Sequence, residues 1–64
     1  MKVKYDREVD ILYIRLTDGA IEESDEAQPG IVIDYDASGT VVGFEIMNAS
    51  KKITQPSMVQ LEVA

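Results

Sequence analysis

The residues from Asp34 to Glu45, DYDASGTVVGFE, place oxygen-bearing side chains at the spacing of a calcium-binding loop. Asp34, Asp36, Ser38 and Glu45 take ligand positions, and Gly39 takes the position of the sharp turn. An EF-hand also needs a helix on each side of its loop. The five preceding residues are PGIVI, a helix breaker followed by β-branched residues. The stretch therefore predicts a β-hairpin. Its carboxylates Asp34, Asp36 and Glu45 would form an outward patch, suited at most to a weak divalent-metal or small-ligand site.

Other catalytic chemistry has little support in the composition. The chain contains neither histidine nor cysteine. It therefore lacks the commonest general base near neutral pH, the commonest metal ligand and any thiolate zinc site. Its serines have no partner that could activate them as nucleophiles. Its aspartates are expected near turns and in water, where the pKa values of two carboxyls are not pushed apart. We therefore expect a protein that is not an enzyme and that needs no cofactor.

The charge balance is acidic and uneven along the chain. Twelve acidic and six basic residues give a net charge of −6, which disfavours binding to a phosphate backbone. Four acids gather in the segment IEESDEAQ, namely Glu22, Glu23, Asp25 and Glu26. A basic protein partner would match this segment, and a solvated acidic strand or loop is the alternative interpretation.

The length predicts one domain, residues 1–64. A chain of this size buries only about 60% of the surface that its unfolded form exposes, so its core is small. The first residues lack the apolar run of a signal peptide, and no segment approaches the ~20 apolar residues of a membrane span. We therefore expect a cytoplasmic protein without a membrane partner.

Apolar residues alternate with polar ones near the N-terminus, the pattern of half-buried strands. A hairpin that closes across Asp6 to Ile11 pairs Tyr5 with Leu12 and Val3 with Ile14. One face is then wholly apolar, and a slip of one residue would place a lysine among apolar side chains. The other face carries Lys2, Lys4, Tyr13 and Arg15. Asp6 and Asp10 are expected to close the connection by bonding nearby backbone N–H groups.

A second hairpin is predicted with its turn at Ser38-Gly39. This turn pairs apolar residues into one continuous face: Tyr35 with Val42, Ile33 with Phe44, and Ile31 with Ile46. Asp34, Asp36, Gly43 and Glu45 would lie on the opposite face. The acidic segment before this hairpin would form an edge strand, where charges discourage edge-to-edge pairing.

A short helix is predicted within residues 47–53, with Asn48 as its N-cap. Met47 or Ile53 would then cover part of the sheet. Beyond Pro56 the residues SMVQLEVA alternate again, which predicts a last strand or an arm. The predicted fold is mainly β (α+β), an antiparallel β-meander of about five strands with one short helix after the last hairpin. Residues 1–53 would form the core and residues 54–64 the terminal strand or arm.

The predicted fold contains only one short helix, which is too small to cover a face of the sheet. A single sheet must bury its apolar face against another layer. Packing of two copies, or exchange of the C-terminal arm between them, would supply that layer. We therefore expect a homodimer, and the alternative is a monomer whose sheet curls around its own core.

The motifs together resemble a known family. Residues 5–16 read YDxxxDxLYIRL, and the chain continues with PGIV, DYD, a glycine at 39, VG, EI and NAS. This order and spacing, up to about Ile53, is similar to the prokaryotic domain-of-unknown-function family DUF2283. The resemblance implies a compact antiparallel β domain with a short helix, and no assigned activity or site residues. It also suggests, by analogy with neighbouring toxin-like genes, an antitoxin-like role with a basic protein encoded nearby as partner.

Overall fold

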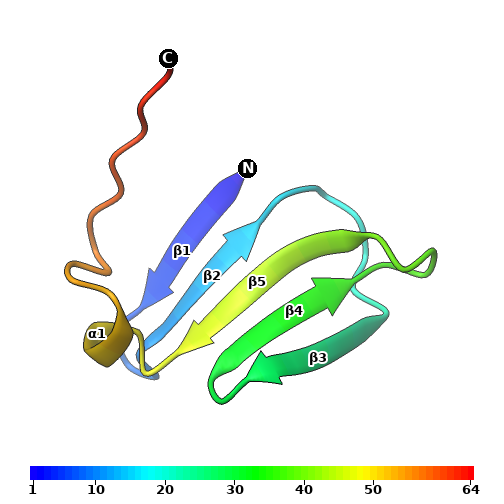
Figure 1. The fold of residues 1–64 in the computed structure, drawn as a ribbon, viewed down its shortest axis with the longest axis horizontal. Coiled ribbons are helices and arrows are strands. Elements are labelled where there is room, and N and C mark those ends of the chain that lie inside the picture. The colour runs from blue at the N-terminus through cyan, green and yellow to red at the C-terminus, as the bar shows by residue number, and fades with distance from the viewer.

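Five antiparallel strands form one sheet, and a single short helix follows the last of them (Figure 1). The computed structural model describes the whole chain, Met1–Ala64. The elements are β1 (Lys2–Asp6), β2 (Ile11–Arg15), β3 (Glu23–Gln28), β4 (Ile31–Tyr35), β5 (Val41–Met47) and α1 (Ala49–Lys52). The prediction of a mainly β fold, with about five antiparallel strands and one helix after the last hairpin, is confirmed. No helix is long and apolar enough to cross a membrane.

The strand order is β1-β2-β5-β4-β3, which differs from a simple meander. The connection from β2 to β3 passes behind the sheet in the view of Figure 1 and reaches the far edge. β5 takes the place beside β2 because it presents Phe44 and Ile46 opposite Ile14 and Leu12. The acidic residues of β3 could not have continued these apolar rows. β1 and β3 are therefore the two edges of the sheet.

Most of the predicted pairing is correct. β1 and β2 pair Tyr5 with Leu12 and Val3 with Ile14. Away from the turn that joins them, β4 and β5 also pair as predicted, Ile31 with Ile46 and Ile33 with Phe44.

The predicted pairing of Tyr35 with Val42 is wrong. Tyr35 pairs with Val41, because the register shifts at Asp34/Tyr35 and leaves Val42 as an extra residue in β5. Val42 is only 1% exposed. The β2–β3 connection covers it, since a Cβ built on Gly19 would lie 3.3 Å from Val42 Cγ1.

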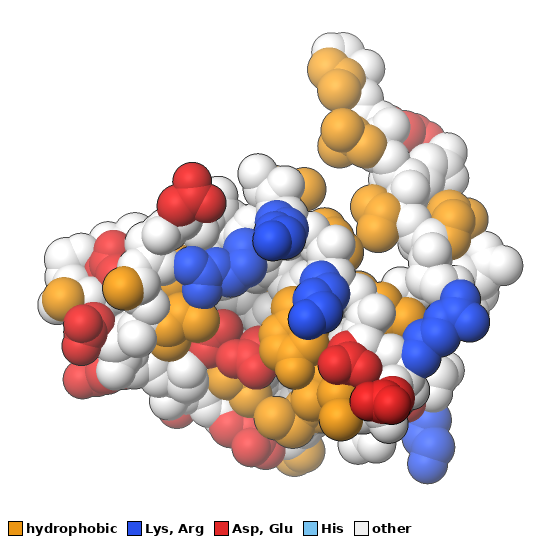
Figure 2. Space-filling view, turned by 180° about the vertical axis from the view of Figure 1, so that it is seen from behind, with side chains coloured by type: hydrophobic (Ala, Val, Ile, Leu, Met, Phe, Trp, Pro, Cys, Tyr) orange, Lys and Arg blue, Asp and Glu red, His pale blue; other side chains and the backbone are white.

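One face of the sheet is apolar and has no second layer. Two rows run across β1, β2, β5 and β4: Val3, Ile14, Phe44 and Ile33, then Tyr5, Leu12, Ile46 and Ile31. We call these eight residues the apolar face. Figure 2, seen from behind, shows basic side chains on the opposite face, so the apolar face is turned toward the viewer in Figure 1, where no other segment crosses it. Of its members only Leu12 is buried, and the other seven are half-buried.

The helix is held at one end of the sheet by Asp10 rather than by its own N-cap. Asn48 occupies the predicted N-cap position, but it has a left-handed φ of 51° and makes no side-chain cap bond. The Asp10 carbonyl accepts the Ala49 N–H at 3.0 Å, and Asp10 Oδ1 accepts the Ser50 N–H at 2.9 Å. Ala49 is fully buried there, so the helix packs beside the sheet end instead of covering a face.

The C-terminal residues form an arm and no strand. No regular structure follows Ile53, and the arm leads away from the sheet in Figure 1. Its large apolar side chains, Met58, Val59, Leu61 and Val63, are between 55% and 88% exposed. Of the two predicted states for residues 54–64, the single chain therefore adopts the arm.

Candidate functional site

The four acidic residues singled out in the sequence lie along one open edge of the sheet. Glu23, Asp25 and Glu26 belong to β3, and Glu22 precedes it directly. All six residues of β3 are exposed. We call this strand with Glu22 the acidic edge. It is an edge strand, as predicted, because β4 is its only neighbour.

The backbone of the acidic edge offers unpaired groups. The Glu22 N–H donates to the Tyr35 carbonyl at 2.8 Å, toward β4. The Met47 N–H donates to the Gly30 carbonyl, so by alternation Val32 and Asp34 face β5, whereas Ile33 and Tyr35 face β3. Their register partners Asp25 and Glu23 therefore bond to β4, and the N–H groups of Ser24 and Glu26 point away from it. The edge therefore combines free backbone donors with a row of carboxylates. At its far end Glu26 Oε1 accepts the Gly30 N–H at 3.3 Å, beside the turn into β4.

The proposed metal set Asp34, Asp36 and Glu45 is not brought together. Asp36 closes the β4–β5 turn, where its Oδ1 accepts the N–H groups of Ser38 at 2.9 Å and Thr40 at 3.0 Å. The Ser38 hydroxyl also donates to it at 2.7 Å, and these hydrogen bonds lower the pKa of Asp36 below its usual value. No group of three or more acidic side chains is placed to share a metal ion.

The expectation that Asp34 lies on a solvated patch is wrong. Asp34 is 2% exposed, and its Oδ1 accepts the Ser24 hydroxyl at 2.6 Å across the β3–β4 pair. Glu45 is its diagonal neighbour on β5. Burial raises the pKa of Glu45, and the hydrogen bond and negative charge of Asp34 raise it further. Glu45 therefore retains its proton more readily than a free glutamate does.

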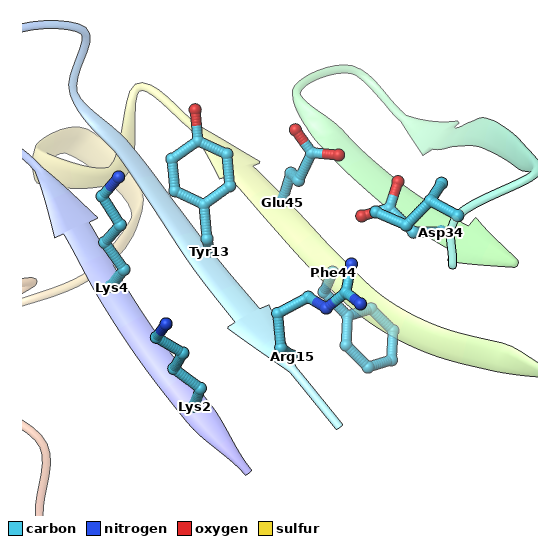
Figure 3. A pocket seen from close by; sticks show the side chains of 8 residues that line it. Lys2, Lys4, Tyr13, Arg15, Asp34, Phe44 and Glu45 are labelled. Carbon is cyan, nitrogen blue, oxygen red and sulfur yellow. The ribbon is translucent and has the colours of Figure 1, made fainter. Parts of the chain in front are cut away.

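These two carboxyls belong to a pocket on the face opposite the apolar face (Figure 3). Its volume is about 360 Å³, and it is lined by Lys2, Lys4, Tyr13, Arg15, Ile21, Asp34, Phe44 and Glu45. Gly43 pairs with Arg15 on one side and Asp34 on the other, so it separates these two side chains. Figure 3 shows the Phe44 ring behind the sheet, away from the polar groups.

The pocket is divided by charge. Its basic half, on β1 and β2, holds Lys2, Lys4 and Arg15, three of the six basic residues of the chain. Its acidic half holds Asp34 and Glu45. Figure 2 shows basic side chains near the middle of this face with acidic ones beside them. Lys4 Nζ lies 5.8 Å from the centre of the Tyr13 ring, a cation–π distance.

The sequence analysis missed this pocket as a site. It placed Lys2, Lys4, Tyr13 and Arg15 on an outer face but assigned them no role. The signal that could have found it is the row Lys2, Arg15, Gly43, Asp34, and this row exists only once β2 is paired with β5. Arg15 also donates to the Gly19 carbonyl, which ties the β2–β3 connection to the pocket rim.

Comparison with known proteins identifies a family. No curated protein and no solved structure matches the chain. The family model described as a protein of unknown function (DUF2283) matches residues 2–50, which include all five strands and the start of α1. The arm lies outside the match. The sheet, its turns and the Asp10 link to the helix thus fall within the matched region, and the chain belongs to the DUF2283 family.

Proposed function

We propose that this protein is a non-enzymatic protein-interaction module that acts as a homodimer and binds a basic partner through its acidic edge. The observation that supports this proposal is the combination, on one strand, of outward backbone N–H groups and exposed carboxylates. The partner class would be a basic protein encoded nearby, such as a ribonuclease toxin, which makes the role antitoxin-like.

The physical basis is the addition of a strand to an open sheet edge. An extended segment can pair with free backbone groups, while its side chains decide which segment is accepted. On β3, Glu23 and Asp25 flank the outward N–H groups, so lysine or arginine side chains on the added strand would be favoured. The same charges disfavour pairing between the acidic edges of two copies. The edge is therefore suited to an unlike, basic partner.

Charge reversal at the edge tests this function. A short extended peptide of alternating lysine and valine should bind the wild-type protein, and its affinity should fall as salt is raised. The triple variant Glu23→Lys, Asp25→Lys, Glu26→Lys should lose at least about tenfold in affinity, equivalent to about 1.4 kcal/mol. Isothermal titration calorimetry measures both effects.

The matched control makes the same change in net charge at three positions outside the acidic edge. Glu8, Asp18 and Glu62 are also exposed, and lysine at all three leaves the acidic edge intact. This control should bind the peptide much more tightly than the edge variant does. Equal losses in the two triple variants would reduce the effect to overall charge and refute a role for the edge.

The pocket supports a second candidate function, the binding of a small ligand. The observation that favours it is the gathering of Lys2, Lys4 and Arg15 beside the buried carboxyl Asp34 in an otherwise acidic chain. A ligand with an anionic group over the basic half and a hydrogen-bond donor toward Glu45 would match both halves. This differs from the surface-carboxylate site expected from the sequence, because cations contribute half of the chemistry.

Titration with inorganic phosphate tests the basic half of the pocket. Amide resonances of β1 and β2 should shift with saturation, and the double variant Lys2→Gln, Lys4→Gln should abolish the shifts. The double variant Arg7→Gln, Lys51→Gln removes the same charge outside the pocket and should leave the shifts in place. A saturating response to calcium at Glu45, with none to phosphate, would instead favour a carboxylate metal site.

A further inference from the structure

The single chain exposes more surface than a compact monomer of its size. Its accessible surface is 4873 Å². A folded monomer of 7.1 kDa is expected to expose about 4,100 Å². The excess is therefore about 800 Å², close to the ~800 Å² that each partner buries in a standard protein–protein interface. The exposed arm contributes part of this excess, and the uncovered face of the sheet contributes to it as well.

One uncovered part of the molecule is the apolar face, where seven of the eight side chains are half-buried. The apolar face presents eight aliphatic or aromatic side chains in two rows, and none of them carries a charge. Only six residues in the whole chain are buried, and one of these is the carboxylate-bearing Asp34. A sheet of this kind normally packs against a second layer about 10 Å away. Nothing in the chain provides that layer.

We propose that the apolar face is the surface on which two copies of this chain pack face to face, as a two-layer β-sandwich. The inference deepens the homodimer of the proposed function and rests on it. A second copy is the occupant that the observations favour, because an uncharged surface is complementary to itself, whereas two acidic edges repel each other. In such a dimer both acidic edges and both pockets remain open to solvent.

The position of the two-fold axis follows from the sheet order. β2 and β5 are the second and third of the five strands, and Ile14 and Phe44 pair between them near the middle of the apolar face. Residues close to a two-fold axis meet their own copies in the partner. Ile14 should therefore lie near the partner's Ile14. Tyr13, the adjacent residue, points to the pocket side and should be far from its copy.

Cysteine cross-linking tests this arrangement directly, because the natural chain contains no cysteine. Light scattering should give twice the chain mass of 7.1 kDa for the wild type and for both single variants. With a short bismaleimide, Ile14→Cys should convert to covalent dimer in high yield. Tyr13→Cys, the matched control, should remain at single-chain mass on a denaturing gel.

Three outcomes would overturn the proposal. A wild type that sediments as a monomer at micromolar concentration would remove the dimer. A dimer that cross-links through Tyr13→Cys and not through Ile14→Cys would place the contact on the pocket face. A dimer that is lost on deletion of residues 57–64, without cross-linking at position 14, would assign the contact to arm exchange.

Binding of the lysine–valine peptide separates this inference from the proposed function. A monomer that still binds the peptide through the acidic edge refutes only the dimer face. A dimer that cross-links through Ile14→Cys but does not bind the peptide refutes only the edge function.

Discussion

Gly43→Ala should unfold at a clearly lower urea concentration than the wild type. A Cβ on Gly43 would lie 2.7 Å from the Ile14 carbonyl oxygen, a backbone atom of the neighbouring strand. Neither atom can move far without disturbing the β2–β5 ladder in the middle of the sheet. Overpacking of this kind costs about 1–3 kcal/mol. A 64-residue chain has about 3–10 kcal/mol of stability at ~0.05–0.15 kcal/mol per residue.

The sign of this effect makes the test specific. At an ordinary strand position, alanine in place of glycine is stabilising by about 0.5–1 kcal/mol. Gly19→Ala serves as the control, because its Cβ would meet side-chain atoms, Thr17 Oγ1 and Val42 Cγ1, both at 3.3 Å. These atoms can shift, so the control should lose less stability. Circular dichroism at one protein concentration for all variants avoids confusion with self-association. A Gly43→Ala variant as stable as the wild type would contradict the close β2–β5 approach.

Asp10→Ala should cause the largest loss of melting temperature among single aspartate variants, and it should release α1 from the sheet. The Asp10 carboxylate accepts hydrogen bonds from the Ser50 N–H, the Ser50 hydroxyl at 2.6 Å and the Tyr5 hydroxyl at 2.7 Å. It thus joins β1, the first turn and the helix. Asp10 also has a φ of 55°, a left-handed conformation that aspartate tolerates better than alanine does.

The control is Asp6→Ala, which removes the acceptor of one bond, from the Glu8 N–H. Thermal melts give the relative losses, and amide hydrogen exchange at Ser50 reports whether the helix is still anchored. If Asp10→Ala keeps the Ser50 amide protected and has the same melting temperature as Asp6→Ala, the link between turn and helix does not hold the fold together.

The effect of Asp10 should also depend on pH. The Ser50 hydroxyl, the Tyr5 hydroxyl and the Ser50 N–H lower the pKa of Asp10 from its usual value of 3.8. A lowered pKa in the folded state means that this contribution to stability is complete above the usual value. It is lost as the pH falls through the lowered pKa. The gap in melting temperature between wild type and Asp10→Ala should therefore be widest near neutral pH and narrow in strong acid.

The features that could be predicted from the sequence are those set by local alternation of side chains. The pairing of Tyr5 with Leu12 and of Ile33 with Phe44 follows because any slip would place a charge among apolar residues. The exposed edge at β3 follows from its acidic composition for the same reason. Both depend on neighbours in the chain or on a single hairpin.

The features that were missed depend on contacts between distant segments. The β2–β5 pairing joins residues about thirty positions apart, and it alone creates the row in which Gly43 separates Arg15 from Asp34. The bulge in β5 lies at Val42, which the β2–β3 connection covers. The alternation of side chains does not predict the path of that connection. Asp10 caps a helix forty residues away, a role that turn chemistry alone does not reveal.

Hydrogen exchange at the acidic edge, with and without the lysine–valine peptide, tests the central claim most directly. The Ser24 and Glu26 N–H groups should exchange quickly in the free protein and become protected when the peptide is added, because they face away from β4 and would pair with the added strand. The N–H groups of Glu23 and Asp25, which face β4, should change little. Protection that appears at β1 or around the pocket instead, with Ser24 and Glu26 unchanged, would contradict strand addition at this edge.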